Sequence, residues 1–169
     1  PAFEQQPNEV ASFRAAVGAV AIDESAYALR VFPGLTAGDA ARVRLLAPSY
    51  FEVDNQLTTI ASGPADVIAV EAEREGRSVL RLRGRVPLGV GRLVYSRRVG
   101  SPLAYAGHAL RAALRARGIA VHGEVRLGRL PEGLPLLAAH ESPPLATLLG
   151  ALGKHSSNFA AETLLKILG

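Results

Sequence analysis

The chain has 169 residues, of which 49% are hydrophobic and 20% are charged, a composition typical of a folded globular protein. It contains no cysteine, which excludes disulfide bonds, a thiolate nucleophile and cysteine metal sites. The formal net charge is +4, almost all from arginine, because Lys154 and Lys166 are the only lysines. The arginines alternate with apolar residues instead of clustering, so solvated strand and helix faces are favoured over a nucleic-acid interface.

Neither a membrane span nor a signal peptide is expected within the chain. No apolar run approaches the ~20 residues that a helix needs to cross a bilayer. The first residues also lack a basic region followed by an apolar one.

The first hundred residues predict a β-rich region. After an irregular segment at 1–16, apolar residues recur with the two-residue period of strands. The polar turn 23–25 suggests a hairpin between its flanking strands, and the charged turn 73–77 predicts a second one. The predicted strands cover residues 17–22, 26–32, 42–46, 50–60, 67–72, 79–83 and 92–99.

A helix is predicted from Pro102 to Arg117, with Ser101 as its N-cap and Gly118 just after its end. Apolar residues at three- and four-residue spacing predict its buried stripe, with His108 on the solvent side. The stripe contains Leu103, Ala106, Leu110, Ala113 and Leu114, and the water-facing arginines are Arg111, Arg115 and Arg117.

The remaining residues predict two strands and a pair of helices. The strands cover 119–127 and 134–140, and a helix capped by Ser142-Pro143 runs over 143–152 and ends at Gly153. This places residues 154–158 in a turn between two helices.

The chemistry of the chain is concentrated in that turn, at Ser156 and Asn158. A hydroxyl and an amide two residues apart can relay a proton and hold a carbonyl group. The competing interpretation is structural, because serine and asparagine are also the preferred helix N-caps. The four histidines lack the spacing of a metal site, so no metal is expected.

The segment from His140 to Leu165 resembles the class C penicillin-binding proteins, which are D-alanyl-D-alanine carboxypeptidases and endopeptidases. In that family a Ser-Pro-Pro-Leu helix leads into Lys-x-Ser-x-Asn and then an Ala-Glu-x-Leu-Leu helix. The matching runs here are Ser142-Pro143-Pro144-Leu145, Lys154-His155-Ser156-Ser157-Asn158 and Ala161-Glu162-Thr163-Leu164-Leu165. Looser similarities to the family's inserted region lie upstream.

The resemblance implies an α+β fold. Residues 1–140 would form a β-rich inserted region of one or more domains with one packed helix. Residues 141–169 would form the helical start of the second half of a transpeptidase, β-lactamase-like domain, which carries the Ser-x-Asn motif.

The resemblance also implies roles for individual residues. Ser156 would hydrogen-bond the active-site lysines and pass a proton to the leaving amine, and Asn158, also catalytic, would bind a substrate amide. Lys154 would lie at the rim of the cleft, and Glu162 would bond backbone amides of the loop. Ser157 fills the variable middle position of the motif.

The implied activity is hydrolysis of peptidoglycan stem peptides through an acyl-serine intermediate. β-Lactams would act as substrate analogues, no cofactor would be needed, and the location would be the periplasm or the extracytoplasmic cell envelope.

Two motifs of the family, Ser-x-x-Lys and Lys-Thr-Gly, are absent from the 169 residues. Acyl transfer by a serine needs an activated hydroxyl with a base in reach. We therefore expect this chain to be an internal piece of a longer enzyme, inactive without the rest of the transpeptidase domain. Its apolar last helix would be mobile or pack against a neighbouring molecule. The alternative is a non-catalytic β-rich module that binds cell-wall polymer or a partner protein.

Overall fold

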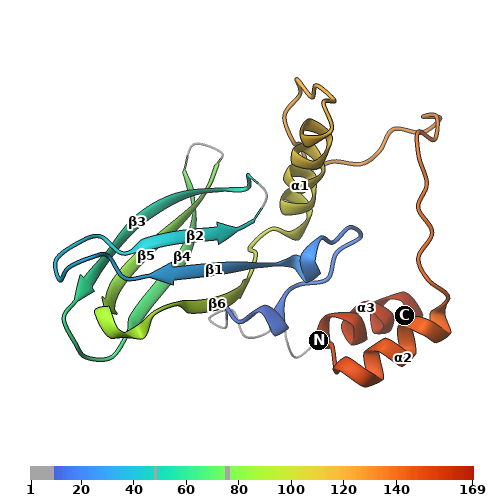
Figure 1. The fold of residues 1–169 in the computed structure, drawn as a ribbon. Helices are drawn as coiled ribbons and strands as arrows, with labels where there is room; N and C mark the ends of the chain where they lie inside the picture. The colour runs from blue at the N-terminus through green and yellow to red at the C-terminus, as the bar shows by residue number, and fades with distance from the viewer. Residues whose placement is uncertain (1–9, 48, 75–76) are drawn as a thin grey trace.

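A computed structural model of the chain describes residues 10–47, 49–74 and 77–169. Within these ranges two three-stranded sheets are followed by helices, so the predicted α+β class is confirmed (Figure 1). The first sheet has the order β2-β1-β6 and the second has the order β3-β5-β4. The strands are β1 (Ala26–Phe32), β2 (Arg42–Leu46), β3 (Phe51–Ile60), β4 (Asp66–Arg74), β5 (Arg77–Pro87) and β6 (Leu93–Arg98).

Each sheet is built around a central strand. β1 pairs antiparallel with both β2 and β6. β5 pairs antiparallel with β4, which confirms the predicted second hairpin, and parallel with β3. The tip of that hairpin, residues 75–76, lies outside the described residues, as do residues 1–9 of the predicted irregular segment.

The core lies between the two sheets. On β1 the buried positions alternate, with Tyr27, Leu29 and Val31 inside. β5 contributes Leu80 and Leu82 to the same cluster. Full burial of one such side chain stabilises the fold by about 1.5–3 kcal/mol. The two-residue period that predicted these strands therefore corresponds to side chains that enter the core.

The predicted strand at 17–22 is wrong. These residues are irregular, and Val20 and Ile22 are exposed. The physical reason is the pairing of β1, because β2 and β6 already occupy both of its edges. A hairpin between 17–22 and 26–32 therefore has no edge on which to form.

The turn at residues 23–25 is confirmed as a short 3-10 helix, η2 (Asp23–Ser25). All three residues have positive φ, at 49°, 53° and 55°, although none is glycine. The two other 3-10 helices in the described ranges are η1 (Ser12–Arg14) and η3 (Leu88–Val90).

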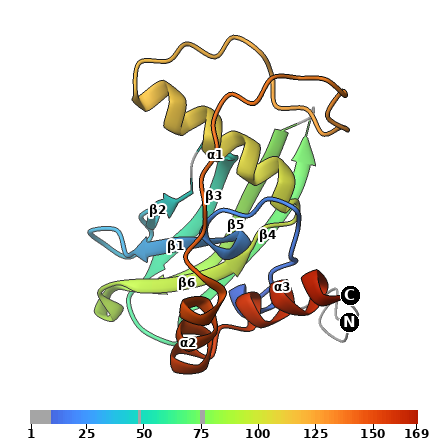
Figure 2. The same ribbon diagram turned by 90° about the vertical axis from the view of Figure 1, so that its right-hand side faces the viewer.

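The predicted long helix is confirmed as α1 (Pro102–Ala116), with Gly118 at φ 77° just beyond its C-cap. Ser101 precedes the helix, but its side chain makes no capping bond. The helix stands over one end of the two sheets (Figures 1 and 2).

The buried stripe predicted for α1 is confirmed at Ala106 but is wrong at Leu103 and Leu110. Leu103 and Leu110 are exposed, and the buried residues are Tyr105, Ala106 and Ala109. The helix turns this face inward because the Tyr105 ring packs edge-to-face on Tyr50, with 5.4 Å between ring centroids, and alanines allow a close approach.

His108 and Arg111, both expected to face solvent, are half-buried. The His108 ring lies 5.6 Å from that of Tyr50. They lie on the inward-turned side of α1, where they line a pocket with residues at the start of β3.

The strands predicted at 119–127 and 134–140 are also wrong, because neither segment has a partner strand in the described structure. The residues from 117 to 144 instead form a long irregular connection. In the second segment Leu136 and Leu137 are 82% and 94% exposed, so no sheet covers them.

Two helices complete the described chain, α2 (Leu145–His155) and α3 (Asn158–Leu168). α2 begins two residues later and ends three residues later than the predicted helix over 143–152, and its N-cap is Pro144, not Ser142. No residue of either helix is buried. Figure 1 shows the pair as a separate layer, and α3 contacts η1. Neither these helices nor any other helix in the described ranges is long and apolar enough to cross a membrane.

Candidate functional site

The Ser-x-Asn motif lies in the tight turn between α2 and α3. Ser156 follows the last residue of α2 in the left-handed conformation, with φ 52° and ψ 42°. Its N–H donates to the Leu152 carbonyl oxygen at 2.8 Å and so closes the helix. Asn158 is the first residue of α3. The turn is thus shorter than the predicted stretch 154–158, because Lys154 belongs to α2.

Ser157, the variable middle residue of the motif, fixes this turn. Its Oγ accepts a hydrogen bond from the Ala160 N–H at 3.2 Å and caps α3. The same hydroxyl donates to the Glu24 carboxylate at 3.2 Å. If the motif were only a helix cap, Ser156 or Asn158 was expected to cap α3, but Ser157 performs this role. The side chains of Ser156 and Asn158, both exposed, are not used to cap the helix.

The two supporting residues lie on either side of the turn. Lys154 is exposed in the last turn of α2 next to His155, where a cation interacts favourably with the negative end of the helix dipole. Glu162 is half-buried one turn into α3. Its Oε1 is buried and accepts no hydrogen bond from the described residues. The expected bonds to backbone amides of the loop are therefore not formed by this atom.

Sequence reasoning did not anticipate the contact between Glu24 and the turn. The two partners are 133 residues apart in the chain, and no local pattern around Glu24 points to α3. No group of histidine and carboxylate residues that could hold a metal ion is found in the part of the chain that the structure describes.

Replacing Ser157 by alanine is expected to loosen the start of α3. The substitution removes the acceptor for the Ala160 N–H, and the loss of a serine N-cap costs about 1 kcal/mol of helix stability. Hydrogen exchange of the Ala160 and Ala161 amides should therefore become faster. Asparagine is an equally good cap, so Ser157→Asn serves as the matched control and should restore protection. Unchanged exchange in the alanine variant would mean that the cap does not hold the turn.

Comparison with known proteins identifies the family. The family model described as the D-Ala-D-Ala carboxypeptidase 3 (S13) family matches residues 5–169. The chain belongs to the S13 peptidase family. The resemblance to class C penicillin-binding proteins seen in the sequence is thereby confirmed, and the matched residues include both sheets, α1 and the Ser-x-Asn turn.

Relatives of this S13 chain agree with the assignment. It is 34% identical over 136 residues to the D-alanyl-D-alanine carboxypeptidase of Actinomadura sp. (strain R39), an alignment that covers 78% of this chain and 25% of the relative. The chain thus spans about a quarter of that protein's length.

Two crystal structures of penicillin binding protein 4 from Haemophilus influenzae share the fold. The first, complexed with a novel β-lactam, has a TM-score of 0.71 and 24% identity, covering 90% of this chain and 35% of its own. The second has a TM-score of 0.74 and 24% identity, covering 93% of this chain and 35% of its own.

Proposed function

We propose that this chain forms part of the active site of a serine-type D-Ala-D-Ala carboxypeptidase or endopeptidase. The reaction is cleavage of peptidoglycan stem peptides through an acyl-serine intermediate. The observation that carries the proposal is the S13 family match, which runs through the Ser156-x-Asn158 turn to residue 169. The activity belongs to the whole protein, because this chain spans only a quarter of its carboxypeptidase relative.

Within that enzyme Ser156 relays the proton to the leaving amine, and Asn158 takes part in catalysis and binds an amide of the substrate. The local geometry supports this assignment, since Ser157 alone caps α3 and both neighbouring side chains are exposed. Lys154 lies at the rim of the cleft, and Glu162 supports the turn from the first part of α3.

The serine nucleophile and the Lys-Thr-Gly strand come from outside residues 1–169, because neither motif occurs within them. The rest of the transpeptidase domain is then the structural partner of residues 141–169, with residues 1–140 as the inserted β-rich region. β-Lactams act as substrate analogues, which the β-lactam complex of a protein with this fold supports. The location that goes with a peptidoglycan substrate is the extracytoplasmic envelope.

Labelled penicillin tests the proposal directly. The full-length protein should be acylated, and the 169-residue chain alone should not. In the full-length protein Ser156→Ala should slow acylation by ~10², the usual contribution of a positioned acid-base group. Because Ser156 has φ 52°, Ser156→Gly should be tested beside it, since glycine removes the hydroxyl without backbone strain.

His155→Ala is the matched control for the acylation rate, because His155 is the exposed neighbour on α2 and has no assigned role. A full-length protein that never labels would favour a non-catalytic module that binds cell-wall polymer or a partner protein. If both Ser156 variants were acylated at the wild-type rate, Ser156 would not be the residue that relays the proton.

A further inference from the structure

A pocket of about 650 Å³ lies between α1 and one end of the β3-β5-β4 sheet. Its volume is in the range of small-molecule sites, about 300–1,000 Å³. The walls come from the inner face of α1, the starts of β3 and β5, the end of β4, and the irregular segment that follows α1. None of the lining residues belongs to α2 or α3, so this pocket lies outside the proposed role of the Ser-x-Asn turn.

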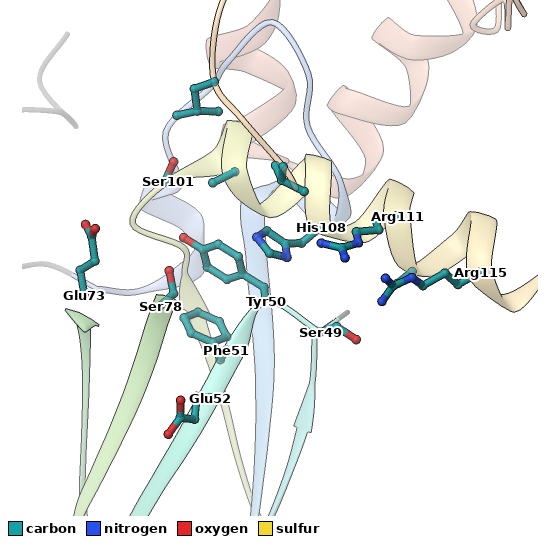
Figure 3. A pocket seen from close by; sticks show the side chains of 14 residues that line it. Ser49, Tyr50, Phe51, Glu52, Glu73, Ser78, Ser101, His108, Arg111 and Arg115 are labelled. Carbon is teal, nitrogen blue, oxygen red and sulfur yellow. The ribbon is translucent and has the colours of Figure 1, made fainter. Parts of the chain in front are cut away.

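The helix wall of the pocket is cationic. His108, Arg111 and Arg115 are three, four and seven residues apart, so all three point to the same side of α1 (Figure 3). Burial and, second, the positive charge of Arg111 lower the pKa of His108, so the charge at neutral pH comes from the two arginines. Two arginines four residues apart repel each other unless an anion lies between them.

Arg111 also carries an unsatisfied donor. Its Nε is buried and makes no hydrogen bond with the described residues. A buried donor without an acceptor is unfavourable, so the Arg111 guanidinium gains from any rotation that brings this N–H to an acceptor. Arg115 is anchored from the other side, because one of its terminal nitrogens donates to the Val121 carbonyl oxygen at 3.1 Å.

The opposite wall is acidic and the floor is aromatic. Glu52 and Glu73 line the strand side, and Figure 3 shows them on the far side of the Tyr50 and Phe51 rings from the arginines. The two rings meet edge-to-face, with 4.6 Å between centroids, and hold the two charged walls apart. Among the described lining residues, two arginines lie on one side of this apolar surface and two glutamates on the other.

We propose that this pocket binds a short peptide as a zwitterion. The ligand carboxylate accepts hydrogen bonds from the guanidinium groups of Arg111 and Arg115. The ligand ammonium faces Glu73, and its apolar backbone and side chains lie over Tyr50 and Phe51. A simple anion fits less well, because it has no ammonium group for the strand wall and no apolar part for the two rings.

Titration of the 169-residue chain with the tripeptide Ala-Ala-Ala, followed by calorimetry, tests the proposal. Ala-Ala-Ala amide, which lacks the carboxylate, should bind at least ~10-fold more weakly, because charge-assisted hydrogen bonds are lost. N-acetyl-Ala-Ala-Ala, which lacks the ammonium, should lose less affinity, since Glu73 is exposed and its charge is screened. Inorganic phosphate at the same concentration should not compete.

Substitutions in the chain locate the site. The double change Arg111→Gln and Arg115→Gln should weaken binding of the tripeptide at least ~10-fold. Arg117→Gln is the matched control, because Arg117 is the C-cap residue of α1 and does not line the pocket, and this variant should bind as the wild type does. Arg115→Gln alone affects an exposed side chain and so provides a folded variant if the double variant does not fold.

Four results would overturn the proposal. They are no binding of the tripeptide by the wild-type chain, equal binding of the amide, equal binding by a folded Arg115→Gln chain, and displacement of the tripeptide by phosphate.

Discussion

Replacing Gly84 by alanine is expected to destabilise the chain by at least about 3 kcal/mol, a large part of the stability of a small domain. Gly84 lies inside the central strand β5 with φ 124°, a conformation that alanine rarely adopts. An added methyl group would also overlap the carbonyl oxygen of Asp66 on β4. The strand cannot shift away from this clash, because Gly84 pairs with Leu57 on its other side. Urea denaturation measures the effect.

Two other glycines allow the stability loss from the steric clash to be distinguished from the loss caused by backbone strain. Gly91 has φ 64° and nothing within 4 Å of an added methyl, so Gly91→Ala should cost only about 1–2 kcal/mol. Gly89 is equally open and has no positive φ, so Gly89→Ala should change stability by less than about 0.5 kcal/mol. If Gly84→Ala were no more harmful than Gly91→Ala, the close packing of β4 on β5 would be refuted.

Alkaline pH is expected to remove several kcal/mol of stability. Burial, as the main cause, raises the pKa of Tyr27, Tyr50 and Tyr105 from 10.0 to about 12. Above pH 10 the unfolded chain releases these protons while the folded chain keeps them, so the unfolded state is favoured. The stability is therefore complete below pH 10 and is lost as the pH rises towards 12. Each tyrosine contributes on the order of 2–3 kcal/mol to the loss.

Unfolding midpoints in urea at a series of pH values from 10 to 12 check this expectation. Other groups contribute little in this range, because the chain has only two lysines and arginine stays protonated. Tyr27→Phe removes one of the three hydroxyls and should make the decline with pH less steep. A midpoint that stays constant to pH 12 would show that the tyrosines are not protected from solvent in the folded chain.

The strands of this protein could be predicted where one face is buried. Along β1 every second residue enters the core, and this period is visible in the sequence. On β5 Leu80 and Leu82 follow the same period, although the adjacent Val79 is buried as well. Their pairing could not be predicted, because β3 lies parallel to β5 although β4 separates them in the chain. The segment 17–22 has the composition of a strand, but the edges of β1 are filled by distant residues.

The site shows the same division between local and distant effects. Two helices flanking Ser156 and Asn158 could be predicted from local capping residues and apolar spacing. The orientation of α1 could not be predicted, because it depends on the packing of Tyr105 against Tyr50 and not on the number of leucines on each face of the helix. For this reason His108 and Arg111, which are half-buried in the structure, were expected to face water.

The left-handed turn η2 contacts both α1 and the residue that precedes α3, two parts of the chain that are far apart in the sequence. The Asp23 carboxylate makes a long contact, 3.5 Å, with the Tyr105 hydroxyl on α1, and the adjacent Glu24 accepts the hydrogen bond of Ser157 before α3. Three non-glycine residues at positive φ cost roughly 1–2 kcal/mol each, so this turn persists only while its surroundings hold it. Because the two carboxylates share one short piece of backbone, the helix that forms the arginine-lined pocket and the segment that leads into the helix after the Ser-x-Asn motif both contact the same three-residue turn.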